Sequence, residues 1–274
     1  MKRSLVSAGL ALLLAACAVP GTPIPALDAG PASPAPLPPP ARGPLGPERI
    51  TGSLALARPA QPVLAVRYEA ALVVDHCADR DLAAPPTSDV VFTILDRSYA
   101  LPAGYAPDDL VAASAAGLTG NSGTRLVRSV LLDDLAGMRG AWEAAGLSVL
   151  VESAYRSYAS QAATFNRWTA RLGQAAALLR TARPGHSEHQ LGTAIDVTSP
   201  GWTGRFGDWA VESAEGAWMV EHAWEYGFVM SYPADGQAQT CYGYEPWHYR
   251  WIGRDAAAAH RASGLHLRKF LEDR

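Results

Sequence analysis

The chain has 274 residues, which suits one domain of ordinary size with appendages, or at most two small domains. Lys and Arg number 23 against 26 Asp and Glu, and this balance argues against the basic surface that nucleic-acid binding needs, so we expect no nucleic-acid partner. Apolar residues make up 49% of the chain, enough for a sizeable core.

The first 16 residues have the pattern of an export signal. Two basic residues precede the apolar run Leu5 to Ala16, which is too short to span a bilayer as a helix. The run ends in Leu14-Ala15-Ala16-Cys17, which resembles the lipobox of bacterial lipoproteins, where the cysteine is acylated and becomes the first mature residue. We therefore expect a lipid anchor on Cys17 and an extracytoplasmic protein bound to a bacterial membrane, in the cell envelope or periplasm. An ordinary secretory signal is the alternative.

A tether and an extension follow this signal. Residues 17–48 are dominated by Pro, Ala and Gly, a composition that cannot bury a core and favours extended polyproline II. At about 3.1 Å per residue, such a tether reaches roughly 90 Å as an upper limit. Residues 49–89 form an N-terminal extension with two β-prone runs, Val63 to Val66 and Ala71 to Val74.

The main domain is expected at residues 90–274 and combines strand-like and helical patterns. Short β-prone runs predict strands at Val90–Leu95, Leu147–Val151, Phe228–Tyr232 and Tyr244–Tyr249. Helical periodicity predicts helices at Thr124–Ala145, Tyr158–Leu172, Val211–Tyr226 and from Arg254 onward. Leu101 to Pro107 reads as loop, and Asp108 or Asp109 is expected to cap a short helix after it. Together these elements predict an α+β fold, in which helices pack on a small antiparallel sheet.

Two cysteines remain once Cys17 is set aside. An even number in an exported protein favours one disulfide between Cys77 and Cys241. Two separate thiols are the alternative. A metal-ligand role for Cys241 is less favoured. The candidate zinc site of His189, Asp196 and His248 has three protein ligands, and a fourth would close the coordination position that a hydrolytic site keeps for water.

The residues that carry chemistry are two histidines and an aspartate. Two imidazoles and one carboxylate form the ligand set of a hydrolytic zinc site, which keeps a fourth position for water. His189 and Asp196 are seven residues apart and need a bend between them, which Gly192 permits. Asp196 lies in a β-prone run, where a carboxylate is costly unless it is paired or binds a metal. His248 comes from a distant element and completes the set, so we expect one Zn²⁺ per chain.

A second carboxylate, Glu245, lies three residues before His248. Pro246 follows it directly and imposes an extended or turn conformation on Glu245. Such a kink can bring both side chains to the same side of the chain. Glu245 is therefore the candidate general base beside the metal.

These segments resemble the VanY-type D-alanyl-D-alanine carboxypeptidases, zinc peptidases that are related to the VanX dipeptidases and the hedgehog signalling domain. The resemblance covers roughly residues 90 to 253. Its motifs are Ser153-Ala154-Tyr155-Arg156-Ser157-Tyr158-X-X-Gln161, Ser187-X-His189-X-X-Gly192-X-Ala194-X-Asp196 and Glu245-Pro246-Trp247-His248. One departure is Cys241, which stands where the family usually carries a small residue.

The resemblance implies a role for each motif residue. His189, Asp196 and His248 would bind zinc and Glu245 would be the catalytic base. Arg156 would meet the terminal carboxylate of the substrate or the developing oxyanion, for which a guanidinium fork is suited. Further substrate contacts are expected from Tyr155, Gln161 and Ser187, although Gln161 and Ser187 can instead brace the loop.

The function that follows is removal of the C-terminal D-alanine from peptidoglycan stem peptides by a zinc D,D-carboxypeptidase. The alternatives are an L,D-carboxypeptidase or a peptidoglycan endopeptidase of the same fold, because the cleft walls decide the specificity. A zinc-stabilised cell-wall-binding module without activity is a third possibility, which intact Glu245 and Arg156 argue against. We expect a monomer.

Overall fold

The computed structural model describes residues 77–87 and 89–274. The expected signal at 1–16, the lipidation site Cys17, the tether at 17–48 and both β-prone runs of the extension lie outside the described residues. Within the described part of the chain, none of the helices has the length and apolar character needed to cross a membrane.

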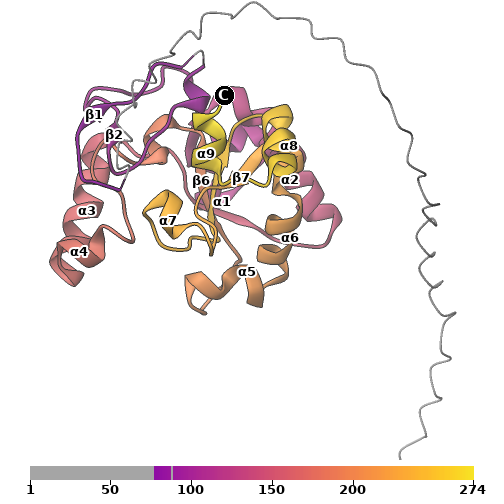
Figure 1. Ribbon diagram of the computed structural model, residues 1–274. Coiled ribbons are helices and arrows are strands. Elements are labelled where there is room, and N and C mark those ends of the chain that lie inside the picture. The colour runs from indigo at the N-terminus through magenta and orange to yellow at the C-terminus, as the bar shows by residue number, and fades with distance from the viewer. Residues whose placement is uncertain (1–76, 88) are drawn as a thin grey trace, which may run out of the picture. The chain divides into compact units, whose positions relative to one another are not determined.

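A four-stranded antiparallel sheet is the centre of the domain (Figure 1). Its strands are β5 (Leu150–Ser153), β6 (Ala194–Thr198), β7 (Phe228–Met230) and β8 (His248–Trp251), in the order β5-β6-β8-β7. Neighbouring strands run antiparallel at all three junctions. The predicted α+β fold with a small antiparallel sheet is thereby confirmed.

The two faces of this sheet have different side chains, because successive residues of a strand point to opposite faces. Ile195, Val197 and Tyr249 are almost fully buried in the main hydrophobic cluster. Asp196 and His248 alternate with them and therefore lie on the other face. The sequence thus puts the core on one side of the sheet and the polar site on the other.

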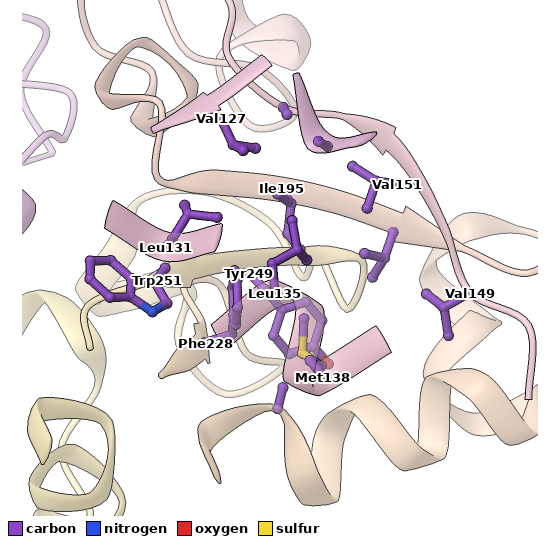
Figure 2. Close-up of a cluster of buried hydrophobic side chains, with 14 of the residues drawn as sticks. Val127, Leu131, Leu135, Met138, Val149, Val151, Ile195, Phe228, Tyr249 and Trp251 are labelled. Carbon is purple, nitrogen blue, oxygen red and sulfur yellow. The ribbon is translucent and has the colours of Figure 1, made fainter. Parts of the chain in front are cut away.

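The helix α2 (Leu132–Ala144) covers the core face of the sheet. Leu135, Met138 and Trp142 follow one another at helical spacing and are almost fully buried. Figure 2 shows Leu135 and Met138 in the same cluster as Ile195 and Tyr249. The helix α6 (Ala214–His222) and the following 3-10 turn (Ala223–Tyr226) complete this core, and Gly227 ends the turn in the left-handed conformation.

The helix α3 (Tyr158–Leu172) has the bounds that the sequence predicts. The Ser157 side chain caps it by accepting a hydrogen bond from the backbone N–H of Ser160 at 3.3 Å. Gly173 ends it with a φ of 79°. The short helix α4 (Gln174–Ala177) follows directly.

The remaining elements are short. Strand β1 (Leu82–Ala83) pairs in parallel with β2 (Tyr99–Ala100), and β3 (Leu110–Ala112) pairs antiparallel with β4 (Leu126–Arg128). The helices are α1 (Gly120–Gly123), α5 (Trp209–Glu212), α7 (Gln237–Thr240), α8 (Arg254–Ser263) and α9 (Leu267–Glu272). Further 3-10 turns lie at Val90–Phe92, Ala113–Ala116, Ser129–Leu131, Glu188–Leu191 and Phe206–Asp208.

The predicted helix at Thr124–Ala145 is wrong over its first turns. Residues 126–128 form strand β4, and the helix begins only at Leu132. Val127 is fully buried and lies opposite Val111 of β3, so pairing with a distant strand overrides the local helical spacing. The predicted helix after Asp108 or Asp109 is wrong for the same reason, because β3 occupies that position. Asp109 instead accepts a hydrogen bond from Arg128 Nε at 2.8 Å.

The predicted strand at Val90–Leu95 is also wrong. Residues 90–92 form a 3-10 turn, which the Asp89 side chain caps by accepting a hydrogen bond from the Val91 N–H at 3.0 Å. The carbonyl oxygens of Val91 and Thr93 accept hydrogen bonds from the buried Arg250 guanidinium, at 2.6 and 2.8 Å. These carbonyl oxygens therefore bind a side chain and not the backbone N–H groups of a neighbouring strand.

A disulfide joins Cys77 to Cys241, with 5.4 Å between the Cα atoms. It connects positions 164 residues apart in the sequence and so closes a very long loop. Native disulfides typically stabilise a domain by about 2–5 kcal/mol. Cys241 has a φ of 67° and ends helix α7, four residues before Glu245. The bond therefore anchors the segment that leads to the candidate base.

Candidate active site

The pairing of two strands positions Asp196 and His248. They are direct partners in the β6–β8 register although they are 52 residues apart in the sequence. Residues opposite one another in an antiparallel pair project from the same face. His248 Nδ1 lies 2.9 Å from Asp196 Oδ1.

His189 reaches the same point from the 3-10 turn Glu188–Leu191, which precedes β6. Gly192 ends this turn with a φ of 75°, in the left-handed region that favours glycine. A Cβ atom at Gly192 would meet Arg128 Cγ at 2.9 Å and Leu110 Cδ2 at 3.0 Å. The bend expected at Gly192 is therefore present, and it brings His189 Nε2 to 3.1 Å from Asp196 Oδ2.

The donor atoms of these three residues fit a metal ion. One atom each from His189, Asp196 and His248 lies within 4.8 Å of the others. His189 Nδ1 lies 2.7 Å from the carbonyl oxygen of Ala154, to which it can donate, so Nε2 is left as the ligand atom. His248 Nε2 lies 2.9 Å from Glu188 Oε2, which leaves Nδ1. In metal-binding histidines the second ring nitrogen commonly donates to such an oxygen.

Glu188 is the site residue that the sequence analysis missed. It is 5% exposed and accepts hydrogen bonds from Ser231 Oγ at 2.6 Å and from Arg250 Nη1 at 2.9 Å, besides its contact with His248. Arg250 is fully buried, two residues after His248 in strand β8 and hence on the same face. A buried arginine on that face requires an anionic partner, and this is the signal that could have indicated Glu188.

Glu245 is brought beside the site by a turn. The backbone N–H of His248 donates to the carbonyl oxygen of Glu245 at 3.0 Å, which closes a four-residue turn with Pro246 in its second position. The predicted strand at Tyr244–Tyr249 is therefore wrong before His248, and the kink expected at Pro246 is this turn. Among the described residues no hydrogen-bond or ion-pair partner engages the Glu245 carboxylate, which lines the cleft.

Arg156 projects from the segment after β5 and is held by its neighbours. Its backbone N–H donates to the His189 carbonyl at 3.1 Å, and its Nη2 lies 3.6 Å from Asp196 Oδ2. Nη1 donates to Gln161 Oε1 at 2.8 Å and Nη2 to Ser153 Oγ at 3.0 Å. A guanidinium has five N–H donors, and two of them make these hydrogen bonds to described residues.

The other expected substrate contacts differ in their surroundings. Gln161 is fully buried, and besides accepting from Arg156 it donates to the Ala182 carbonyl at 2.6 Å, an arrangement that braces Arg156. Ser187 is nearly buried at the wall of the cleft. Tyr155 is not among the residues that line the cleft. The structure thus gathers Arg156, Gln161 and Ser187 around the site and leaves Tyr155 outside it.

The site opens into a cleft of about 980 Å³, near the upper end of the range for ligand pockets. One wall comes from α3 and the segment after α4 and includes Trp168, Leu179 and Arg180. Phe206 and Trp247 also line the cleft, and their rings meet edge to face with centroids 5.4 Å apart.

Burial and neighbouring charges shift the pKa values of the site residues in opposite directions. Burial alone would raise the pKa of Asp196, but His189 and His248 hold it well below its usual range. Burial would lower the pKa of His248, and hydrogen bonds to Asp196 and Glu188 outweigh it and raise the pKa to about 10. Burial raises the pKa of Glu245 to about 8, which marks it as a carboxyl group that can exchange a proton near neutral pH.

Comparisons with known proteins agree with this geometry. The family model VanY, described as D-alanyl-D-alanine carboxypeptidase, matches residues 124–254. YodJ of Bacillus subtilis, whose name assigns it to the carboxypeptidases, is 32% identical over 183 residues, which are 66% of this chain and 67% of that protein.

Two solved structures are similar as well. The LdcB LD-carboxypeptidase is 32% identical with a TM-score of 0.58, over 65% of this chain and 84% of that one. A vancomycin-resistance D,D-pentapeptidase VanY, solved in complex with Zn(II), is 27% identical with a TM-score of 0.56, over 67% of this chain and 99% of that one.

Proposed function

Because the chain belongs to the VanY family of D-alanyl-D-alanine carboxypeptidases, we propose that it is a zinc-dependent D,D-carboxypeptidase that removes the C-terminal D-alanine from peptidoglycan stem peptides. The observation that carries the proposal is the convergence of His189, Asp196 and His248 in one cleft beside Glu245, whose carboxylate has no hydrogen-bond or ion-pair partner among the described residues. A zinc-stabilised binding module without activity would not need that free carboxylate.

The metal site requires only residues that the structure already brings together. His189 Nε2, one Asp196 oxygen and His248 Nδ1 would hold one zinc ion. A zinc ion bound there would polarise the scissile carbonyl and lower the pKa of water towards about 7. Three protein ligands are the number found in catalytic zinc sites, whereas structural sites use four. Cys241 is held in the disulfide and is therefore not a fourth ligand.

The chain's own side chains supply the rest of the chemistry. Glu245 would take a proton from the attacking water and deliver it to the leaving amine. Arg156 would bind the free carboxylate of the terminal residue or the oxyanion that develops during attack. Ser187 at the cleft wall remains a proposed contact to the substrate peptide.

Replacing Arg156 by lysine is expected to lower kcat/KM by about 10- to 150-fold, because it removes a hydrogen bond to a charged group worth about 1.5–3 kcal/mol. Steady-state kinetics on a stem pentapeptide checks this. If KM rises and kcat is unchanged, Arg156 contacts the terminal carboxylate of the substrate. If kcat falls by the same factor as kcat/KM, Arg156 contacts the oxyanion that develops during attack. Arg261→Lys, an exposed change on α8, serves as the control, and an Arg156→Lys enzyme that matches it would contradict the assignment.

Reaction of the purified, zinc-loaded protein with defined muropeptides tests the function. We expect mass spectrometry to show loss of one alanine from pentapeptide stems. An L,D-carboxypeptidase is the second candidate, favoured by the 32% identity to LdcB, and it would instead remove the terminal D-alanine of tetrapeptides. If neither peptide were shortened, the proposal would be wrong.

We also propose that the domain acts outside the cytoplasm, attached to a membrane by lipid on Cys17. The Cys77–Cys241 disulfide supports an oxidising compartment, because such bonds persist there and are rare in the cytosol. Peptidoglycan is the substrate that this location offers.

A further inference from the structure

His248 makes contacts on both sides of its ring. Its Nδ1 lies 2.9 Å from Asp196 Oδ1, on the side of the candidate metal, and its Nε2 lies 2.9 Å from Glu188 Oε2 on the far side. Glu188 is 5% exposed and His248 is 3% exposed, so water does not compete strongly for this contact. The carboxylate thus presents an acceptor to the nitrogen that does not face the metal.

Glu188 is itself fixed in place by a chain of buried contacts. Arg250 Nη1 donates to Glu188 Oε1 at 2.9 Å, and Ser231 Oγ donates to Glu188 Oε2 at 2.6 Å. The other end of the Arg250 guanidinium donates to the carbonyl oxygens of Val91 and Thr93. The 3-10 turn at 90–92 therefore supports Arg250, which supports Glu188, which contacts His248.

We propose that Glu188 is a positioning residue of the metal site, which accepts the Nε2 proton of His248 in a hydrogen bond and so presents the lone pair of Nδ1 to the zinc ion. Arg250 fixes the orientation of the Glu188 carboxylate through its hydrogen bond to Oε1. The inference rests on the proposed function, since it concerns the zinc ion that the three ligands would hold. Outer contacts of this kind orient the ring and raise the basicity of the ligand nitrogen.

The test is the zinc affinity of folded, metal-free Glu188→Gln, measured by competition with a chromophoric chelator. We expect zinc to bind about 10- to 100-fold more weakly than to the wild type, the usual cost of losing such a contact. We also expect the visible absorption bands of the Co²⁺-substituted protein to shift, because the orientation of a ligand ring changes. Neither readout depends on turnover.

Asp96→Asn is the matched control. Asp96 is a buried carboxylate that accepts a hydrogen bond from Nε of the partly buried Arg268 at 2.9 Å, so this change also converts the carboxylate partner of an arginine to an amide. Asp96 is not among the residues that line the cleft. We expect Asp96→Asn to lower the melting temperature and to leave the zinc dissociation constant and the Co²⁺ spectrum unchanged.

A double variant, Glu188→Gln with Arg250→Gln, separates positioning from mere packing. It removes both charges, so no unpaired guanidinium stays buried and the variant remains useful if Glu188→Gln alone does not fold. If Glu188 positions His248, the folded double variant should still bind zinc weakly. A purely structural ion pair predicts that the wild-type affinity returns.

Four results would count against the inference. Wild-type zinc affinity and an unshifted Co²⁺ spectrum in Glu188→Gln would overturn it, as would restored affinity in the double variant. An equal loss of affinity in Asp96→Asn would overturn it by showing a general effect of destabilisation. A wild-type protein that binds no zinc would overturn the proposed metal site as well, so the two failures are distinguishable.

Discussion

Replacement of Glu245 by alanine is expected to lower kcat by about 10²- to 10⁴-fold, the contribution typical of a positioned acid or base. Zinc content should remain at one ion per chain, because Glu245 is not among the three residues that form the metal cluster. Steady-state kinetics on a stem pentapeptide and metal analysis of the same preparation measure both quantities. The combination of a lost rate and a retained metal distinguishes a base from a ligand.

Glu212→Ala provides the comparison for this variant. Glu212 is exposed on α5 and is not one of the residues lining the cleft, so its removal should leave both quantities unchanged. Near-normal cleavage by Glu245→Ala would show that the base has been assigned to the wrong residue. Loss of zinc from Glu245→Ala would show that this carboxylate holds the metal.

Replacement of His189 by alanine is expected to abolish stoichiometric zinc binding and, with it, the activity. The variant loses one of three ligands, so the fall in zinc affinity should exceed the roughly 100-fold upper bound for an outer contact. Inductively coupled plasma mass spectrometry of the dialysed protein, with circular dichroism to confirm the fold, tests this.

His222→Ala is the matched histidine control. Its imidazole is 41% exposed and pairs with Glu225, so zinc content and activity should match the wild type. One zinc ion per chain in dialysed His189→Ala would remove His189 from the proposed ligand set.

The local parts of this structure were predictable because the determinants lie next to one another in the sequence. Ser157 and Gly173 bound α3 by capping and by backbone conformation, and the predicted bounds are confirmed. Gly192 and Pro246 are also local signals, and the bend and the turn that they indicate are present. These features depend on backbone chemistry within a few residues.

Other parts could not be predicted because they depend on distant partners. Val127 has helical spacing, but its position is decided by pairing with Val111. Glu188 reads as an ordinary exposed carboxylate between two motif residues, and its buried partner Arg250 lies 62 residues further on. The alignment of Asp196 with His248 likewise comes from a strand register that composition alone does not specify.

The covalent link between Cys77 and Cys241 also has a mechanical consequence. A pulling force applied to the chain ahead of Cys77 can pass through the sulfur bridge to Cys241 as well as along the backbone, so part of it bypasses the 163 positions in between. The force that takes this path would reach the stretch 241–245 without loading the two-residue pairing of β1 with β2. Tension on the amino-terminal side would thus be transmitted to the backbone segment that precedes Glu245, the candidate base.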